Sequence, residues 1–162
     1  RTLTSGCGKG ITFSNLKDCA AKKLQNNNLN IKSKTINALM TGMQKKAELF
    51  DKTGGTHTAA LADQNNLLWV LEDIGRHNTI DKIIGKAFLQ GIDLNNKVIL
   101  TSGRVSSEII IKVAKQQIPI LISRSAPTSS AVEIAREKNI TLIGFTRGNR
   151  YNIYNDINRI KY

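Results

Sequence analysis

The chain has 162 residues, 40% hydrophobic and 22% charged, which is enough apolar material for one domain-sized core and argues against wholesale disorder. Two cysteines are too few for a disulfide framework, and no apolar run reaches the about 18 residues of a membrane span. The 24 Lys and Arg against 12 Asp and Glu give a formal net charge of +12, which predicts a nucleic acid, an acidic membrane surface or a phosphorylated ligand as partner. No secretory signal opens the chain, and because it begins at Arg1 we expect a fragment or a processed product.

Helical periodicity and turn residues predict alternating helices and strands. In chain order we expect a helix over 34–50 capped by Ser33, and then strands over 57–62 and 67–71 joined at Asn65 and Asn66. A helix around 80–88 that stops at Gly91 follows, then a strand over 97–101, a helix from Ser106 or Ser107 to Gln116, and a strand over 119–123. The last elements we expect are a helix over 130–138, capped by Thr128 or Ser129 and ended by Asn139, and strands over 140–145 and 151–154. This alternation predicts an α/β fold with a mostly parallel sheet and one N-terminal hairpin. Only residues 1–32 look loosely organised.

The positive charge is of two kinds. Residues 1–50 carry nine Lys or Arg against two acids, and their lysines stand among asparagines, which is typical of a solvated surface. The later arginines instead stand beside Gly or Ser at expected loops; they are Arg76, Arg104, Arg124, Arg147 and Arg150. A guanidinium with free backbone N–H groups nearby suits phosphate recognition.

Five segments carry more Gly-flanked polar chemistry than a core needs. They are 4–10 (TSGCGKG), 53–57 (TGGTH), 72–78 (EDIGRHN), 102–108 (SGRVSSE) and 123–129 (SRSAPTS). The last four lie at or near element ends, where open α/β sheets gather ligands and where helix N-termini favour anions.

Cys7 lies between Gly6 and Gly8 and is followed by Lys9. A nearby ammonium favours the thiolate, so Cys7 is a candidate sulfur nucleophile, with an incidental thiol as the alternative. Cys19, in an apolar context without Gly or Pro, is better explained as a small buried hydrophobe.

The two histidines, His57 and His77, are candidates for neutral hydrogen-bonding or acid–base groups in a polar pocket, and capping or core positions are the alternative. The sequence has neither the C-x-x-C nor the H-E-x-x-H spacing of a zinc site, so we expect no metal. A P-loop, a dinucleotide fingerprint and a serine-nucleophile elbow are also absent. Nucleic-acid binding is weakly supported, because aromatic residues are 5% of the chain and do not alternate with basic ones.

Taken together, the ordered motifs resemble the FdhD family of formate dehydrogenase accessory sulfurtransferases. The resemblance rests on TSGCG at 4–8, TGGTH at 53–57, EDIGRHN at 72–78 with Asp81 and Lys82, SGRVSSE at 102–108, SRSAPT at 123–128 and GFTRGNR at 144–150. It covers almost the whole chain, which looks like the C-terminal region of a longer family protein.

The resemblance implies a three-layer α/β/α, cytidine-deaminase-like fold without zinc. It divides the chain into a flexible sulfur-carrying loop and basic segment, 1–32, and an α/β domain, 33–162. It also implies an enzyme that receives persulfide sulfur from a cysteine desulfurase and passes it to a bis-molybdopterin guanine dinucleotide cofactor, of which GDP is a partial mimic. Formate dehydrogenase is then a further partner, and we expect a cytoplasmic homodimer without nucleic acid or membrane.

Carried over to this sequence, the resemblance makes Cys7 the sulfur carrier and the residues from Phe145 to Arg150 a cofactor loop. The loop consists of Phe145, Thr146, Arg147, Gly148, Asn149 and Arg150, and the further pocket candidates are His57, Arg76, His77, Arg104, Ser106, Ser107, Arg124, Ser125 and Thr128. Asp73 or another loop acid is a candidate for accepting guanine N–H groups.

One departure concerns the sulfur loop, where many family members have C-x-x-C and this chain has Gly10 in the second position. The sequence therefore allows only a single-cysteine persulfide there. The missing cysteine favours a first rival, a chaperone that holds and delivers the cofactor without carrying sulfur. Further rivals are a nucleic-acid-binding α/β protein and a divergent zinc deaminase, which lacks the ligands.

Overall fold

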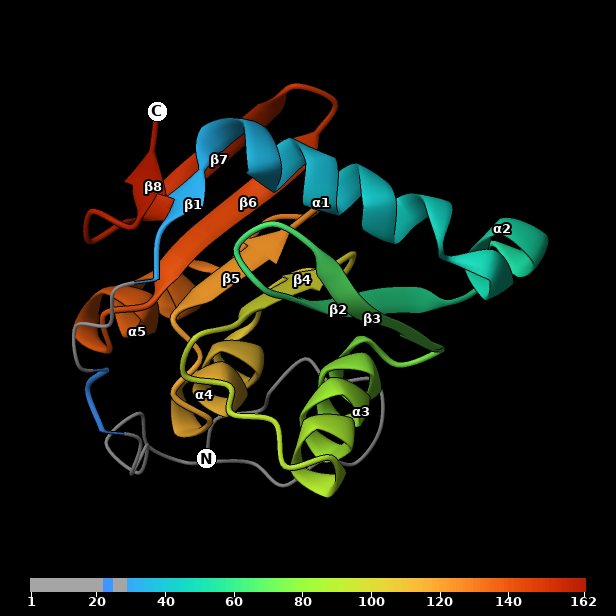
Figure 1. Cartoon of the computed structure of the whole chain (residues 1–162), viewed down its shortest axis with the longest axis horizontal. Helices are drawn as coiled ribbons and strands as arrows, with labels where there is room; N and C mark the ends of the chain where they lie inside the picture. The colour runs from blue at the N-terminus through green and yellow to red at the C-terminus, as the bar shows by residue number, and fades with distance from the viewer. Residues whose placement is uncertain (1–21, 25–28) are drawn as a thin grey trace.

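The computed structural model describes residues 22–24 and 29–162. Its elements in chain order are β1 (Ile31–Lys32), α1 (Ser33–Lys45), α2 (Glu48–Thr53), β2 (His57–Ala62), β3 (Leu67–Asp73), α3 (Arg76–Leu89), β4 (Val98–Thr101), α4 (Ser107–Lys115), β5 (Ile120–Ser123), α5 (Ser129–Glu137), β6 (Thr141–Arg147), β7 (Arg150–Asn155) and β8 (Ile160–Lys161) (Figure 1). The expected mixed α/β architecture is confirmed.

A six-stranded sheet in the order β3-β2-β4-β5-β6-β7 forms the centre of the molecule. Only the pairings β4–β5 and β5–β6 are parallel, whereas β2–β3, β2–β4 and β6–β7 are antiparallel. The predicted hairpin of β2 and β3 is confirmed, but the prediction of a mostly parallel sheet is wrong. A second hairpin, β6–β7, extends the other edge, and tight turns of this kind join antiparallel strands.

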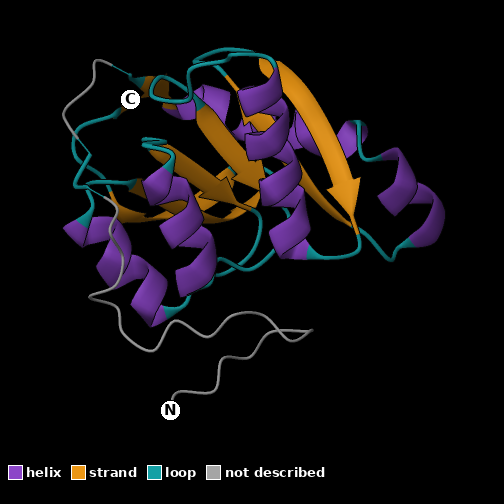
Figure 2. Cartoon of the chain, turned by 90° about the horizontal axis from the view of Figure 1, so that it is seen from below, coloured by secondary structure: helices purple, strands orange, loops and turns teal. Residues whose placement is uncertain are grey.

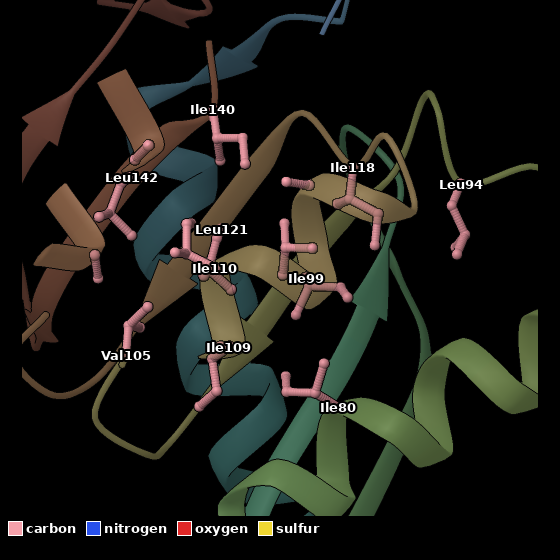
Figure 3. Packing of buried hydrophobic residues seen from close by; sticks show 14 of the residues in the cluster. Ile80, Leu94, Ile99, Val105, Ile109, Ile110, Ile118, Leu121, Ile140 and Leu142 are labelled. Carbon is pink, nitrogen blue, oxygen red and sulfur yellow. The ribbon is translucent and has the colours of Figure 1, made fainter. Parts of the chain in front are cut away.

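Helices cover both faces of the sheet, as the three-layer prediction requires. Helix α1 lies on one face, and α3, α4 and α5 lie on the other, below the sheet in Figure 1 and in front of the strands in Figure 2. Neighbouring strand residues point to opposite faces of the sheet. Leu100 and Ile122 therefore pack with α1 on one face. Ile99 and Leu121 pack against α4 on the other face. Figure 3 shows the second set meeting Ile109 and Ile110 of α4.

The helix ends follow the predicted chemistry in three places. Thr128 is the N-cap of α5, and its hydroxyl accepts a hydrogen bond from the backbone N–H of Ala131 at 3.2 Å. Asn139 and Gly91 follow α5 and α3 with φ of 59° and 63°, the left-handed conformation that ends helices.

The prediction of one helix over 34–50 is wrong, because two helices occupy this region. Helix α1 ends at Lys45, and Ala47, with φ of −85° and ψ of 70°, leaves helical geometry before α2 begins. Ser33 does not cap α1 either, since its hydroxyl hydrogen-bonds to the hydroxyl of Tyr151 at 2.7 Å and Lys32 occupies the N-cap position.

Part of the predicted basic segment packs on the α/β domain. Leu24, Leu29 and Ile31 are buried, and the backbone N–H of Leu24 donates to the carbonyl of Lys138 at 3.0 Å. Strand β1 pairs in parallel with β8. The division of the chain at residue 32 stays a prediction, and Cys7, Gly10 and Cys19 lie outside the described residues.

Gly144→Ala is predicted to destabilise the protein, because a Cβ on Gly144 would lie 2.9 Å from Cε2 of Tyr154 and 3.1 Å from the backbone oxygen of Ser125. Overpacking of this kind costs about 1–3 kcal/mol. Urea denaturation measures the free energy of unfolding. Gly85→Ala is the matched control, since Gly85 lies in α3 with nothing within 4 Å of the added carbon. If the two variants are equally stable, the close approach at Gly144 is unimportant.

Candidate functional site

The candidate site lies beside the ends of the central strands, where β4 and β5 end and β2 begins. Strands β4 and β5 run parallel in register, so Ser102 and Arg124 follow Thr101 and Ser123 side by side. Because β2 is antiparallel to β4, His57 at its start reaches the same edge, and Figure 1 shows β2 starting beside α2. Motifs far apart in the sequence therefore meet here, as expected at strand ends of an α/β sheet.

Hydrogen bonds join the loops that follow β4 and β5. The hydroxyl of Ser125 donates to the carbonyl of Ser102 at 2.9 Å, and the hydroxyl of Ser123 donates to the carbonyl of Gly103 at 2.8 Å. The backbone N–H of Val105 donates to the carbonyl of Ala126 at 3.1 Å. These bonds fix the backbone that presents Arg104 and Arg124.

A pocket of about 370 Å³ opens at this edge, within the roughly 300–1,000 Å³ typical of small-molecule sites. One side, here called the strand wall, is formed by residues around the starts and ends of strands: Thr56, His57, Thr58, Ser102 and Arg124. The other side, called the helix wall, comes from α1, α2 and their connections: Met43, Gln44, Ala47, Phe50, Asp51, Gly54 and Gly55.

His57 forms part of the strand wall. Its Nδ1 lies 3.4 Å from the hydroxyl of Ser102, which also accepts the backbone N–H of Thr58 at 2.9 Å. Burial, followed by the positive charges of Arg76 and Arg104, lowers the pKa of His57 below its ordinary 6.5. His57 therefore favours the neutral form at pH 7.

Arg76 and Arg124 both have a buried Nε atom without a hydrogen-bond partner among the described residues. Arg124 lines the pocket, and Arg76 packs against Gly103, where an added Cβ would lie 2.9 Å from its Cβ. A buried Nε atom without a partner is costly, and the guanidinium group of Arg124, which lines the pocket, is of the kind that binds phosphate.

His77 belongs to a second cluster at the N-terminal ends of α3 and α4. Its Nε2 lies 3.2 Å from both the hydroxyl of Ser106 and the carboxylate of Glu108, and Ser106 donates to the same carboxylate at 3.0 Å. Because a single ring nitrogen makes both contacts, this is not a nucleophilic relay. Burial and Arg76 lower the pKa of His77, although Glu108 opposes them.

The loop from Phe145 to Arg150 adjoins the pocket residue Arg124. The backbone N–H of Phe145 donates to the carbonyl of Ser125 at 3.2 Å, and Nε of Arg147 donates to the carbonyl of Arg124 at 3.4 Å. Phe145 has φ of 52°, an unusual conformation for an aromatic residue. The residue is 40% exposed beside the loops already described.

The remaining loop candidates differ in their surroundings. The hydroxyl of Thr146 is buried without a partner among the described residues, whereas Gly148, Asn149 and Arg150 are exposed in and beside the β6–β7 turn. Ser107 opens α4, and the hydroxyl of Thr128 is engaged in capping α5. Their roles as ligand contacts stay predictions.

Ser102 is not among the sequence-based pocket candidates, although it opens the SGRVSSE motif, and of the helix wall only Gly54 and Gly55 fall in a motif, TGGTH. Glu72 was also missed, and it holds that wall in place: its carboxylate accepts the backbone N–H groups of Leu49 and Phe50, each at 2.8 Å, and the hydroxyl of Thr56 at 3.2 Å. Its position in the EDIGRHN motif was the available signal, but the partners of Glu72 lie 16 to 23 residues upstream.

The described residues hold no group of three or more His, Cys, Asp or Glu side chains placed to bind a metal. The absence of zinc stays an expectation. Among the described helices, none is both long and apolar enough to cross a membrane.

The chain is thus an α/β/α protein with a pocket at the ends of its central strands, lined by His57 and Arg124. The chain matches the FdhD/NarQ family over residues 1–161 and belongs to that family.

Individual relatives agree with this assignment. The chain is 44% identical over 160 residues to the "sulfur carrier protein FdhD" of Bacillus pumilus and 43% identical over 161 residues to that of Bacillus subtilis. It covers 61% and 62% of these proteins, with 99% of its own length aligned in each case. The crystal structure of a protein described as a formate dehydrogenase accessory protein from Desulfotalea psychrophila is similar with a TM-score of 0.82 and 28% identity, covering 90% of this chain and 62% of that one.

Stability is predicted to fall as the pH is lowered from 7.5 to 5.5. Both histidines of the chain have folded-state pKa values below 6.5, so the unfolded state binds more protons as the pH drops through this value. The stability present above 6.5 is therefore lost toward the lower folded-state pKa values. Urea denaturation at several pH values measures this slope, which should flatten in the double variant His57→Gln, His77→Gln.

The carboxyl group of Asp73 should not contribute to this slope. Its pKa is lowered to about 2, first by the hydrogen bond from Lys82, so it does not titrate in the same range. A slope that is flat in the wild type, or unchanged in the double variant, would contradict the assignment to the histidines.

Proposed function

We propose that this chain is a sulfur-carrying accessory protein for formate dehydrogenase. In this proposal, Cys7 accepts sulfur from a cysteine desulfurase and delivers it to the molybdenum of a bis-molybdopterin guanine dinucleotide cofactor bound at the strand-end pocket. Family membership and the names of its relatives support sulfur carrying. The observation that carries the cofactor part is the pair of buried, unpartnered Nε atoms of Arg76 and Arg124.

The sulfur step requires a thiolate at Cys7. The thiolate attacks the terminal sulfur of the desulfurase persulfide, a new S–S bond forms on Cys7, and the donor cysteine leaves as its thiolate. In the second step the terminal sulfur leaves Cys7 for molybdenum as sulfide. The metal supplies the two electrons, and the Cys7 thiolate is regenerated.

The length of chain between Cys7 and the domain permits this delivery. The carbonyl of Lys22 accepts a hydrogen bond from Gln117, just beyond the C-terminal end of α4, whereas Ser106 and the pocket loops lie at its N-terminal end. A nine-residue helix is about 14 Å long. The 14 residues between Cys7 and Lys22 can span up to about 50 Å, so the thiol can reach the site.

The residues of the pocket fit part of such a cofactor. Arg124, with Arg76 behind it, suits phosphate groups, and the pocket volume of about 370 Å³ suits one nucleotide portion rather than the whole bis-dinucleotide. The rest of the cofactor would extend past the loop of Phe145 and Arg147. A second copy of the chain would supply a second pocket, so the homodimer is part of this proposal, as is a cytoplasmic location.

A cofactor chaperone that does not carry sulfur is the second candidate function. It is favoured by the single thiol of the sulfur loop, where Gly10 stands in the place of a second cysteine. Both candidates use the same pocket, and they differ only in whether Cys7 becomes persulfidated.

Cys7→Ala is predicted to abolish persulfide formation, because it removes the nucleophilic thiolate. Mass spectrometry after incubation with a cysteine desulfurase and cysteine would show a 32 Da addition on the wild type and none on the variant. Cys19→Ala is the matched control and should keep the addition. Absence of the addition on the wild type would leave the chaperone as the better explanation, whereas an addition on the Cys7→Ala protein would overturn the assignment of the carrier to Cys7.

Arg124→Ala is predicted to weaken GDP binding about ten- to a hundredfold, because charged hydrogen bonds contribute about 1.5–3 kcal/mol. Isothermal titration calorimetry measures the affinity. Arg136→Ala, at an exposed position in the last turn of α5, is the control and should bind like the wild type. Arg150→Ala tests the β6–β7 turn separately. Equal affinities in the Arg124 and Arg136 variants would remove Arg124 from the pocket.

A further inference from the structure

We propose that Asp51 of α2 recognises the guanine base of the ligand by accepting its N1–H and N2–H groups. The inference rests on the proposed function and assigns the base-reading role that the sequence left open among the acids. Asp51 supplies the one carboxylate among the described residues that line the pocket. Its side chain has no hydrogen bond or ion pair with any described residue, so it can accept bonds from a ligand.

The other acids near the site are already engaged. Glu72 accepts two backbone N–H groups of the α1–α2 region and the hydroxyl of Thr56. Asp73 pairs with Lys82 at 2.6 Å and also accepts bonds from Gly75 and Asn78. Glu108 is held by His77 and Ser106. Asp73, the sequence-based candidate for reading guanine, is therefore a weaker candidate than Asp51.

The two walls of the pocket determine the orientation in which a nucleotide fits. Phosphates are attracted to the strand wall, where Arg124 and His57 lie, and they are repelled by a carboxylate. The helix wall combines Asp51 with the apolar side chain of Phe50, which is 42% exposed and suits the face of a planar base. A nucleotide thus fits with its phosphates on the strand wall and its base on the helix wall.

The identity of the base follows from the donor pattern that a carboxylate accepts. Guanine offers N1–H and N2–H as adjacent donors, which match the two oxygens of Asp51. Adenine presents an acceptor at N1, and hypoxanthine lacks the N2 donor. Because Glu72 anchors the backbone of Leu49 and Phe50, the turn of α2 that carries Asp51 is held in place before the ligand arrives.

Calorimetry with GDP, IDP, ADP and XDP on the 162-residue chain tests this inference. The wild type should bind GDP about tenfold more tightly than IDP, which lacks one donor, and ADP more weakly still. Asp51→Asn should lose about ten- to a hundredfold in GDP affinity. It should gain XDP affinity, since the amide can donate to the C2 oxygen of xanthine. Glu48→Gln removes the same charge from α2 at a residue that does not line the pocket, and should behave like the wild type.

The outcomes separate this inference from the function on which it rests. If the wild type binds GDP but Asp51→Asn keeps the wild-type order of the four nucleotides, Asp51 does not read the base, and the pocket proposal survives. If the wild type binds no guanine nucleotide, both proposals fail. A gain of XDP binding shows that the variant is folded, so loss of GDP affinity together with that gain supports the assignment.

Discussion

The site depends on the bonding between the two loops that follow β4 and β5. Parallel pairing brings Thr101 and Ser123 to the same edge, but it does not by itself fix what comes next. The hydroxyl groups of Ser123 and Ser125 do so, because they donate to the carbonyl groups of Gly103 and Ser102. These bonds satisfy backbone groups that would otherwise be open, and they leave the neighbouring arginine side chains available for a ligand.

A comparison of arginines shows how the site differs from the core. Arg159 is 2% exposed, and its guanidinium donates to the carbonyl groups of Pro119 and Asn139, so it joins the C-terminal segment to the starts of β5 and β6. Arg76 and Arg124 have no such carbonyl partners for their buried Nε atoms among the described residues. Burial first, and then the positive charge of Arg76, lower the pKa values of His57 and His77. Under the proposed function, a phosphate in the pocket would offset the positive charge of Arg124.

Local chemistry in the sequence was enough to predict most elements, but long-range contacts were not visible in it. The cap of α5 and the hairpin of β2 and β3 depend on residues close in sequence, and both were predicted. The break between α1 and α2 depends on Glu72, which lies more than 20 residues downstream of the N–H groups it accepts. Since that break is not visible in the sequence, Asp51 and most of the helix wall are not predicted from it. The arginines of the motifs could be identified because Gly and Ser beside them are typical of loops. That these loops lie close together follows only from the order of the strands in the sheet, which the sequence does not show.

The proposed function makes two different physical demands on the chain. A sulfur carrier has to meet a donor and an acceptor in turn, whereas a cofactor site has to hold its ligand between fixed groups. The loops that follow β4 and β5 are suited to the second demand, because the hydroxyl groups of Ser123 and Ser125 fix the backbone around Arg124. Under the proposed function the first demand falls on Cys7, which lies 15 residues before Lys22 in the sequence, a length of chain that can reach the pocket.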